Sequence, residues 1–127
     1  MEIKHVCWRD VAIDSPVPLL ERKKLVGEHC LVANITLFEG CIVPRHCHAS
    51  EQISFVMSGC LRFEVSDLSG TEWKQIDVQA GEVLCLPANT PHGAVALVDT
   101  VVLDVLSPVS AGMGIDQPGI ASSLPAG

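Results

Sequence analysis

The sequence predicts one all-β domain, a sandwich or barrel of short strands. The chain has 127 residues, which suits a single domain. Short apolar runs rich in β-branched residues recur along it, separated by glycine, proline and asparagine residues. No amphipathic stretch of helical length lies between these runs. The pattern therefore favours an all-β architecture over one in which strands and helices alternate.

Seven segments of the chain carry a strand signal. The clearest is residues 60–66, in which Leu61, Phe63 and Val65 alternate with polar side chains. A period of two is typical of a strand that is buried on one face only. The predicted strands are residues 29–38, 52–57, 60–66, 71–78, 83–86, 92–98 and 100–106.

These strands define the predicted domain organisation. Residues 27–107 are expected to form the barrel, and residues 1–26 an N-terminal arm or edge strand. Within that arm, residues 14–25 contain two prolines and are expected to be irregular or a single helical turn. After Pro108 the chain is rich in small residues, glycine and proline, so residues 108–127 are predicted to be an extended or mobile tail.

The chain is acidic, with a formal net charge of −7 and a pI of about 5.0. Such a surface repels polyanions, so we expect neither nucleic acid nor an anionic membrane as a partner. The longest basic run, residues 22–24, is expected to be a solvated turn or helix face. No apolar run reaches the roughly 20 residues that span a bilayer, and the N-terminal residues do not form a signal peptide. A cytoplasmic location is therefore expected.

Six cysteines are distributed along the chain without any Cys-x-x-Cys spacing. This spacing is needed for the common thiolate zinc sites and for thioredoxin-like redox sites, which are therefore not expected. In a reducing cytosol the cysteines are predicted to be free thiols that are mostly buried as small hydrophobic groups.

Two stretches concentrate the residues that can bind a metal. His46 and His48 are separated by one residue, so on a strand their side chains point to the same side. Gln52 follows after a three-residue bend and can direct its side chain to the same interior. In the second stretch, Pro87 ends a strand and His92 begins another, which we expect to lie across the barrel from the first pair. Clustered imidazoles are typical of first-row transition-metal sites.

Both stretches resemble the two sequence motifs of the cupin superfamily. The first matches Gly-x5-His-x-His-x3-Glu-x6-Gly at every spacing from Gly40 onward, except that Gln52 replaces the glutamate. The second matches Gly-x5-Pro-x-Gly-x2-His-x3-Asn, except that Asn89 replaces the second glycine and Ala96 the asparagine.

The resemblance implies a double-stranded β-helix, the jelly-roll-like, RmlC-like barrel of single-domain metal-binding cupins. It also implies that the barrel holds one divalent transition metal (Fe, Mn, Ni, Zn, Co or Cu) inside. The implied metal ligands are His46, His48, Gln52 and His92.

Glutamine in place of glutamate changes the charge of the implied site. Three imidazoles and an amide are all neutral, so the full +2 charge of the ion remains available to attract an anionic small-molecule substrate. Strand alternation is expected to point the neighbouring Glu51 to the opposite face, and its spacing from His48 is one residue too short for the motif, so Glu51 is expected to be a structural or interface charge.

Within the cupins, the chain most resembles the pectin- and alginate-degradation proteins that open 4,5-unsaturated uronates to linear keto sugars. The resemblance lies in the string HASEQISFVMSG and in the final strand DTVVLDVLSP. In that group an aspartate of the final strand is implicated in proton transfer, and Asp104 stands at its position. The chain departs from the group at Leu106, where a phenylalanine is usual, and at Ser110, where an arginine is usual.

Several functions are consistent with these residues. The first is an enzyme of carbohydrate metabolism that tautomerises or opens a small sugar-acid or keto/enol substrate, with Asp104 as the catalytic acid/base. A cupin dioxygenase and a non-catalytic small-molecule-binding module are the alternatives. The outward-facing residues Ile53, Phe55 and Met57 form an apolar row, from which a homodimer is predicted.

Overall fold

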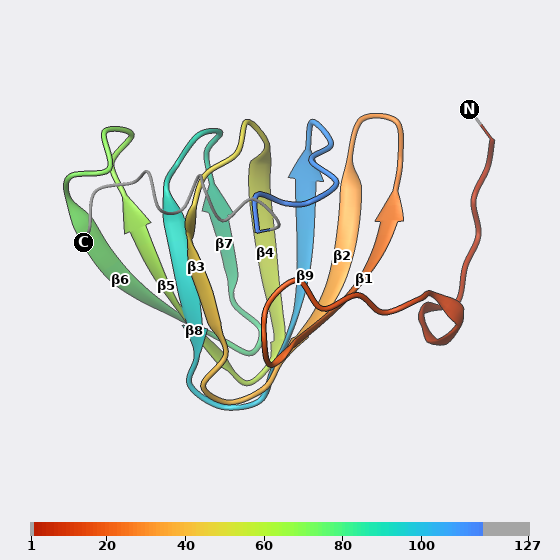
Figure 1. The fold of residues 1–127 in the computed structure, drawn as a ribbon, viewed down its shortest axis with the longest axis horizontal. Helices are drawn as coiled ribbons and strands as arrows, with labels where there is room; N and C mark the ends of the chain where they lie inside the picture. The colour runs from red at the N-terminus through yellow and green to blue at the C-terminus, as the bar shows by residue number, and fades with distance from the viewer. Residues whose placement is uncertain (1, 116–127) are drawn as a thin grey trace.

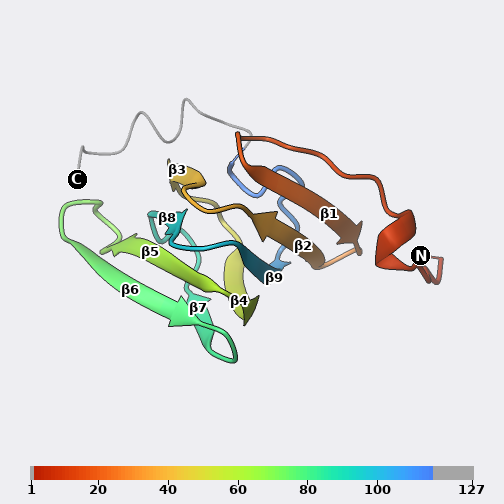
Figure 2. The same ribbon diagram turned by 90° about the horizontal axis from the view of Figure 1, so that it is seen from below.

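The protein is described here by a computed structural model, which defines residues 2–115. These residues form two antiparallel sheets that face each other (Figures 1 and 2). A short 3-10 turn, η1 (Trp8–Asp10), precedes the strands. One sheet has the order β1-β2-β9-β4-β7 and the other β3-β8-β5-β6. The strands are β1 (Leu20–Val26), β2 (Leu31–Leu37), β3 (Ile42–His46), β4 (Glu51–Ser58), β5 (Cys60–Ser66), β6 (Trp73–Gln79), β7 (Val83–Leu86), β8 (His92–Ala96) and β9 (Thr100–Ser107).

The all-β prediction is confirmed, and its physical basis is the period-two burial of the strands. In β2, β5 and β9, alternate side chains are buried between the two sheets. On β9 the inward positions are Val102, Asp104 and Leu106, and this strand lies between β2 and β4 in the five-stranded sheet. An acidic side chain therefore occupies the interior of the barrel beside apolar neighbours.

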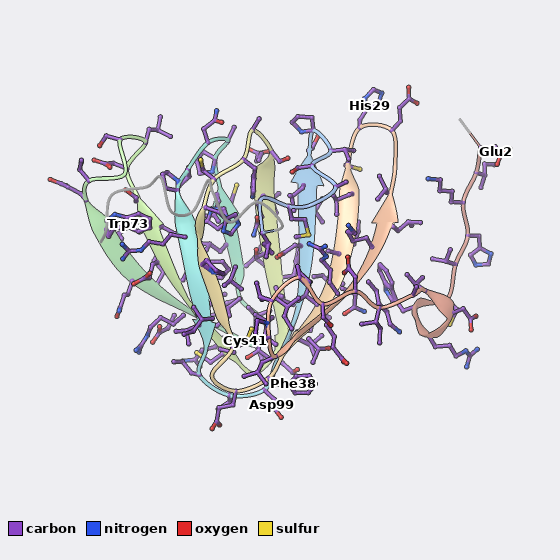
Figure 3. The ribbon with its side chains drawn as sticks, viewed as in Figure 1. Glu2, His29, Phe38, Cys41, Trp73 and Asp99 are labelled. Atoms are coloured by element: carbon purple, nitrogen blue, oxygen red, sulfur yellow. The ribbon has the colours of Figure 1, made fainter. Side chains whose placement is uncertain are left out.

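One end of the barrel is closed by apolar residues and short loops. Figure 3 shows Phe38, Cys41 and Asp99 together at this end, and His29 at the opposite end. Backbone hydrogen bonds here join the loop between β2 and β3 to the end of β8, with Ala96 N donating to Cys41 O at 3.0 Å. Strand β3 starts immediately after Cys41, so its last residue, the predicted ligand His46, lies away from the closed end.

The expectation that residues 14–25 are irregular or helical is wrong for the last residues of that stretch. Strand β1 pairs antiparallel with β2 along its whole length and forms the edge of the sheet. Its inward positions include Arg22, which is fully buried and pairs with both carboxylate oxygens of Asp14, at 2.9 and 2.7 Å. The basic run is therefore part of a strand and not a solvated turn. A buried arginine, paired with the half-exposed Asp14, stands at an inward position where an apolar residue would mark a strand.

The first part of the predicted tail packs against the barrel. We call residues 108–115 the C-terminal strap. Met113 within it is buried among the core residues. Three side chains donate to the strap's carbonyl groups: Ser50 to Pro108, Lys24 to Ala111 and Arg22 to Gly112. Residues 116–127, the rest of the predicted tail, lie outside the described residues.

The cysteine prediction is only partly correct. All six thiols are free, but Cys41 alone is buried, whereas Cys7, Cys30 and Cys85 are exposed. Cys85 lies on β7 at an outward position, and Cys30 lies in the turn between β1 and β2. Period-two alternation explains the exposure of Cys85, because its thiol points to the outer face of the sheet.

The outer face of the five-stranded sheet carries the apolar row noted in the sequence. Phe55 and Met57 on β4 are 38% and 58% exposed, while the intervening Val56 is buried. This alternation is as expected, and the homodimer inferred from it stays a prediction. Across residues 2–115, no helix is long and apolar enough to cross a membrane.

Candidate metal centre

Three histidines converge inside the half of the barrel that lies away from the closed end. His46 is the last residue of β3 and His92 the first of β8, and the two are register partners on adjacent strands. His48 lies two residues beyond the end of β3. The ligand nitrogens of the three rings all lie within 4.8 Å of one another. His92 therefore joins the cluster from the neighbouring strand of the same sheet, and not from across the barrel as expected.

A backbone hydrogen bond joins the loops that carry the two motifs. The N–H of Asn89 donates to the carbonyl of His48 at 2.8 Å. Asn89 has a φ of 64°, in the left-handed region that asparagine tolerates better than most residues. Asparagine therefore preserves the turn at the position where the cupin motif has glycine.

The orientation of each imidazole is set by a hydrogen bond from its Nδ1 to a nearby carbonyl oxygen. The pairs are His46 with Pro44 at 2.7 Å, His48 with Ser50 at 3.0 Å, and His92 with Thr90 at 2.8 Å. Because Nδ1 carries the proton in each pair, Nε2 carries a lone pair. The same arrangement fixes the tautomer of histidines that bind metals through Nε2.

These lone pairs are acceptors that cannot hydrogen-bond to one another, but a cation placed among them would satisfy them. Within residues 2–115, Nε2 of His92 is buried and has no hydrogen-bond partner. Burial lowers the pKa of His46 to about 4 and holds the pKa of His92 well below its ordinary value. Both rings are therefore neutral near pH 7, which is the form that binds a metal.

Gln52 reaches the cluster from β4 in the other sheet. Its Oε1 lies 3.1 Å from Nε2 of His48, and its residue is 4% exposed. A carboxamide oxygen and an unprotonated imidazole nitrogen are both acceptors, so a cation placed beside them would satisfy both. The structure thus brings together all four predicted ligands, while Glu51 is exposed on the opposite face as expected.

Asp104 is connected to Gln52 through one serine that the sequence analysis did not single out. Ser54 Oγ donates to Oδ1 of Asp104 at 2.6 Å and accepts from Nε2 of Gln52 at 3.0 Å. Burial raises the pKa of Asp104 to about 6, although the hydrogen bond from Ser54 opposes this shift. The signal for Ser54 was its place two residues after Gln52 on the same strand face.

Four polar residues, His46, Gln52, His92 and Asp104, border a small cavity of about 30 Å³. Such a cavity holds an ion or about two water molecules. Its wall is otherwise largely apolar, and two of its residues belong to the C-terminal strap, Met113 and Ile115. Gly114 lies so close to the cluster that an added Cβ would be 2.7 Å from Cδ2 of His46. The strap therefore covers the metal centre, a role that its small-residue composition did not indicate.

Comparison with known proteins identifies the family. The sequence profile of the cupin domain matches residues 35–107, which include both histidine motifs and the final strand. No curated protein proved significantly similar to the chain.

Several solved structures share the fold. KdgF from Halomonas sp. is 23% identical with a TM-score of 0.73, over 88% of this chain and 99% of that one. An RmlC-like cupin from Shewanella frigidimarina is 22% identical with a TM-score of 0.73, over 87% and 95%. A mutant of Bacillus subtilis oxalate decarboxylase OxdC is 20% identical with a TM-score of 0.73, over 81% of this chain but only 29% of that enzyme.

These similarities confirm the predicted double-stranded β-helix. The profile match covers more than half of the chain, and the histidine cluster lies where the two motifs meet. The chain therefore belongs to the cupin domain family, and its three-histidine cluster is able to hold a metal ion.

Proposed function

We propose that this cupin is an enzyme that tautomerises or opens a small anionic sugar-acid or keto/enol substrate. In this proposal one divalent metal is held by His46, His48, Gln52 and His92, and Asp104 transfers the proton. The observation that carries the proposal is the position of Asp104, a buried carboxyl group that lines the same cavity as His46 and His92. When bound, a divalent ion polarises a substrate oxygen and stabilises the negative charge that develops on it.

The residues of the cavity have distinct roles in such a reaction. Asp104 accepts a proton from the substrate and returns it at another atom, which is efficient for a group whose pKa lies near the working pH. Its own pKa of about 6 is suitable. The apolar wall excludes water, so that the proton is transferred within the cavity and not lost to solvent.

The neutral ligand set supports an anionic substrate. None of the four proposed ligands carries negative charge, so the ion's charge is left to be balanced by a carboxylate or enolate. Imidazole and amide donors suit Fe, Mn, Ni, Zn, Co and Cu in differing degrees, and metal availability decides among them. One protein of similar fold, the Bacillus subtilis oxalate decarboxylase, has Mn(II) centres.

Uronates are the first substrate class to test. The sequence resemblance supports this choice, because Asp104 corresponds in it to the aspartate that is implicated in proton transfer in the uronate-opening cupins. Ser110, in contrast, stands where those proteins have an arginine, which would pair with a substrate carboxylate through two hydrogen bonds. A keto/enol substrate that lacks the uronate ring is therefore the second class.

The C-terminal strap limits what can enter. A sugar acid is much larger than the cavity of about 30 Å³, which the strap residues Met113 and Ile115 help to close. A cupin dioxygenase, with a redox-active ion on the same ligands, is the second candidate, and its organic substrate meets the same size limit. In both candidates the strap moves aside to admit the substrate.

The activity test compares the wild-type protein with Asp104→Asn. Each protein is loaded with Fe²⁺, Mn²⁺ or Zn²⁺ and incubated with 4,5-unsaturated uronates and with diketones, and proton NMR in D₂O follows ring opening and exchange. We expect turnover by the wild type and a loss of about 10²- to 10⁴-fold in kcat in the variant, with unchanged metal content.

An oxygen electrode supplies the contrasting readout for the same samples. Oxygen uptake without tautomerisation would favour the dioxygenase. Tight ligand binding with neither activity would favour the non-catalytic binding module. Equal kcat values for wild type and Asp104→Asn would remove Asp104 from the mechanism.

Asp104 also makes the stability of the metal-free protein depend on pH. Its pKa is raised from 3.8 to about 6 in the folded chain. Between these values the unfolded chain loses the proton while the folded chain keeps it, so the contribution of Asp104 to stability falls as pH rises, by up to about 3 kcal/mol. His46 and His92, which share its cavity, have pKa values lowered by burial, so their contribution has the opposite sign, and it is common to the wild type and to a variant at Asp104.

The variant Asp104→Asn is therefore predicted to lose this pH dependence. Relative to the wild type, its free energy of unfolding should rise by up to about 3 kcal/mol between about pH 4 and about pH 8. Urea unfolding of both proteins in the presence of a chelator measures the difference, and comparing the two pH values cancels any effect of the substitution on packing. Parallel pH profiles for the two proteins would show that Asp104 titrates normally.

Displacement of the strap can be tested with Gly114→Ala. Gly114 has a φ of +74°, and an added Cβ would be 2.7 Å from His46, so the backbone has to shift. We expect the amides of residues 109–115 to exchange hydrogen about tenfold faster or more, as measured by mass spectrometry. Gly81→Ala is the matched control, because Gly81 has a φ of +86° with nothing within 4 Å. Unchanged exchange in Gly114→Ala would contradict tight packing of the strap on the metal centre.

A further inference from the structure

Ser54 occupies an unusual position for a small polar residue. It lies in the middle of β4, its residue is 0% exposed, and its register partner on β9 is Asp104. Its hydroxyl contacts Gln52 on one side and Asp104 on the other. A buried hydroxyl with two specific partners fixes the direction of both hydrogen bonds.

The direction follows from the number of protons available. A serine hydroxyl has one proton and two lone pairs. The proton is donated to Oδ1 of Asp104 at 2.6 Å, so only a lone pair is left for Gln52. The end of the carboxamide that faces Ser54 must therefore be the donating Nε2, which lies 3.0 Å away.

The other end of the carboxamide is then determined. The two ends of a glutamine side chain are nearly equal in size, and only the oxygen can bind a metal. With Nε2 held by Ser54, Oε1 faces the imidazoles, 3.1 Å from Nε2 of His48. If the carboxamide were turned over, its N–H₂ group would face the cluster and no oxygen ligand would be present.

We propose that Ser54 is a positioning residue that selects the metal-binding orientation of the Gln52 carboxamide and couples it to Asp104. This inference rests on the proposed role of Gln52 as a metal ligand. The hydrogen bonds run in one direction, from Gln52 to Ser54 to Asp104, and so connect the metal site to the proposed acid/base. Partners of this kind typically change metal affinity by 10- to 100-fold when they are removed.

The test is a calorimetric titration of the metal-free variants with Co²⁺. Ser54→Ala is expected to bind Co²⁺ about tenfold more weakly than the wild type, and its visible Co²⁺ spectrum is expected to change because the oxygen ligand is lost. Ser54→Thr keeps the hydroxyl and should restore much of the affinity. Ser58→Ala, at the exposed end of the same strand, is the matched control and should bind as the wild type does. Urea unfolding verifies that each variant is folded.

The variant Gln52→Glu provides a second background, in which an effect of Ser54 on side-chain orientation can be separated from an effect on packing. In Gln52→Glu both ends of the side chain are oxygens, so its orientation does not matter to the metal. Adding Ser54→Ala to Gln52→Glu should therefore change Co²⁺ affinity by less than about twofold, the remaining effect of a lost hydrogen bond outside the ligand shell.

Two results would overturn the inference. One is wild-type Co²⁺ affinity in Ser54→Ala, and the other is an equal loss in both backgrounds, which would mean that Ser54 acts by packing alone. Gln52→Ala distinguishes this failure from failure of the proposed site. Weakened binding in Gln52→Ala with unchanged binding in Ser54→Ala would keep Gln52 as a ligand and reject the role of Ser54. Unchanged binding in Gln52→Ala would reject the ligand set itself.

Discussion

Hydrogen-bond acceptors that are buried together without a donor are unfavourable unless a cation lies among them. The interior of this barrel is built in that way. Three imidazoles donate from Nδ1 to backbone carbonyls, which leaves a lone pair on each Nε2, and the ligand nitrogens of the three rings lie within 4.8 Å of one another. The oxygen of Gln52 joins them from the opposite sheet. The other features of the site, including the loop contact at Asn89, the strap and Ser54, either hold these acceptors in place or keep water away from them.

The two sheets contribute different chemistry to the same cavity. The four-stranded sheet supplies His46 and His92 on adjacent strands, with His48 just beyond. The five-stranded sheet supplies a polar row in which Gln52, Ser54 and Asp104 are hydrogen-bonded in sequence. A substrate bound between the sheets would meet a Lewis acid on one side and a proton carrier on the other. This division is consistent with tautomerisation. The hydrogen bonds from Gln52 through Ser54 to Asp104 also connect a proposed metal ligand with the proposed acid/base.

The sequence was most informative where period and spacing reflect a repeating physical constraint. Strand alternation located the inward face of β9, and therefore the burial of Asp104, while the motif spacings located His46, His48, Gln52 and His92. It was least informative where buried polar groups replace apolar ones. Strand β1 was not recognised because its inward residue Arg22 is charged. Arg22 is buried and paired with Asp14, a partner that only the fold brings near. The burial of Met113 could not be foreseen from its neighbours, since small residues suit both a mobile tail and a strap packed on a ring. That His92 neighbours His46 in one sheet depends on strand order, which local patterns do not encode.

The central claim is that the three imidazoles and the Gln52 carboxamide share one cation. The most direct measurement is a crystal structure of the protein with anomalous diffraction recorded on both sides of several transition-metal absorption edges. We predict a single anomalous peak bonded to Nε2 of His46, His48 and His92 and to Oε1 of Gln52, at distances of about 2.0–2.2 Å. A metal-supplemented crystal with no peak among these four atoms, or with the imidazoles turned away from one another, would contradict the account.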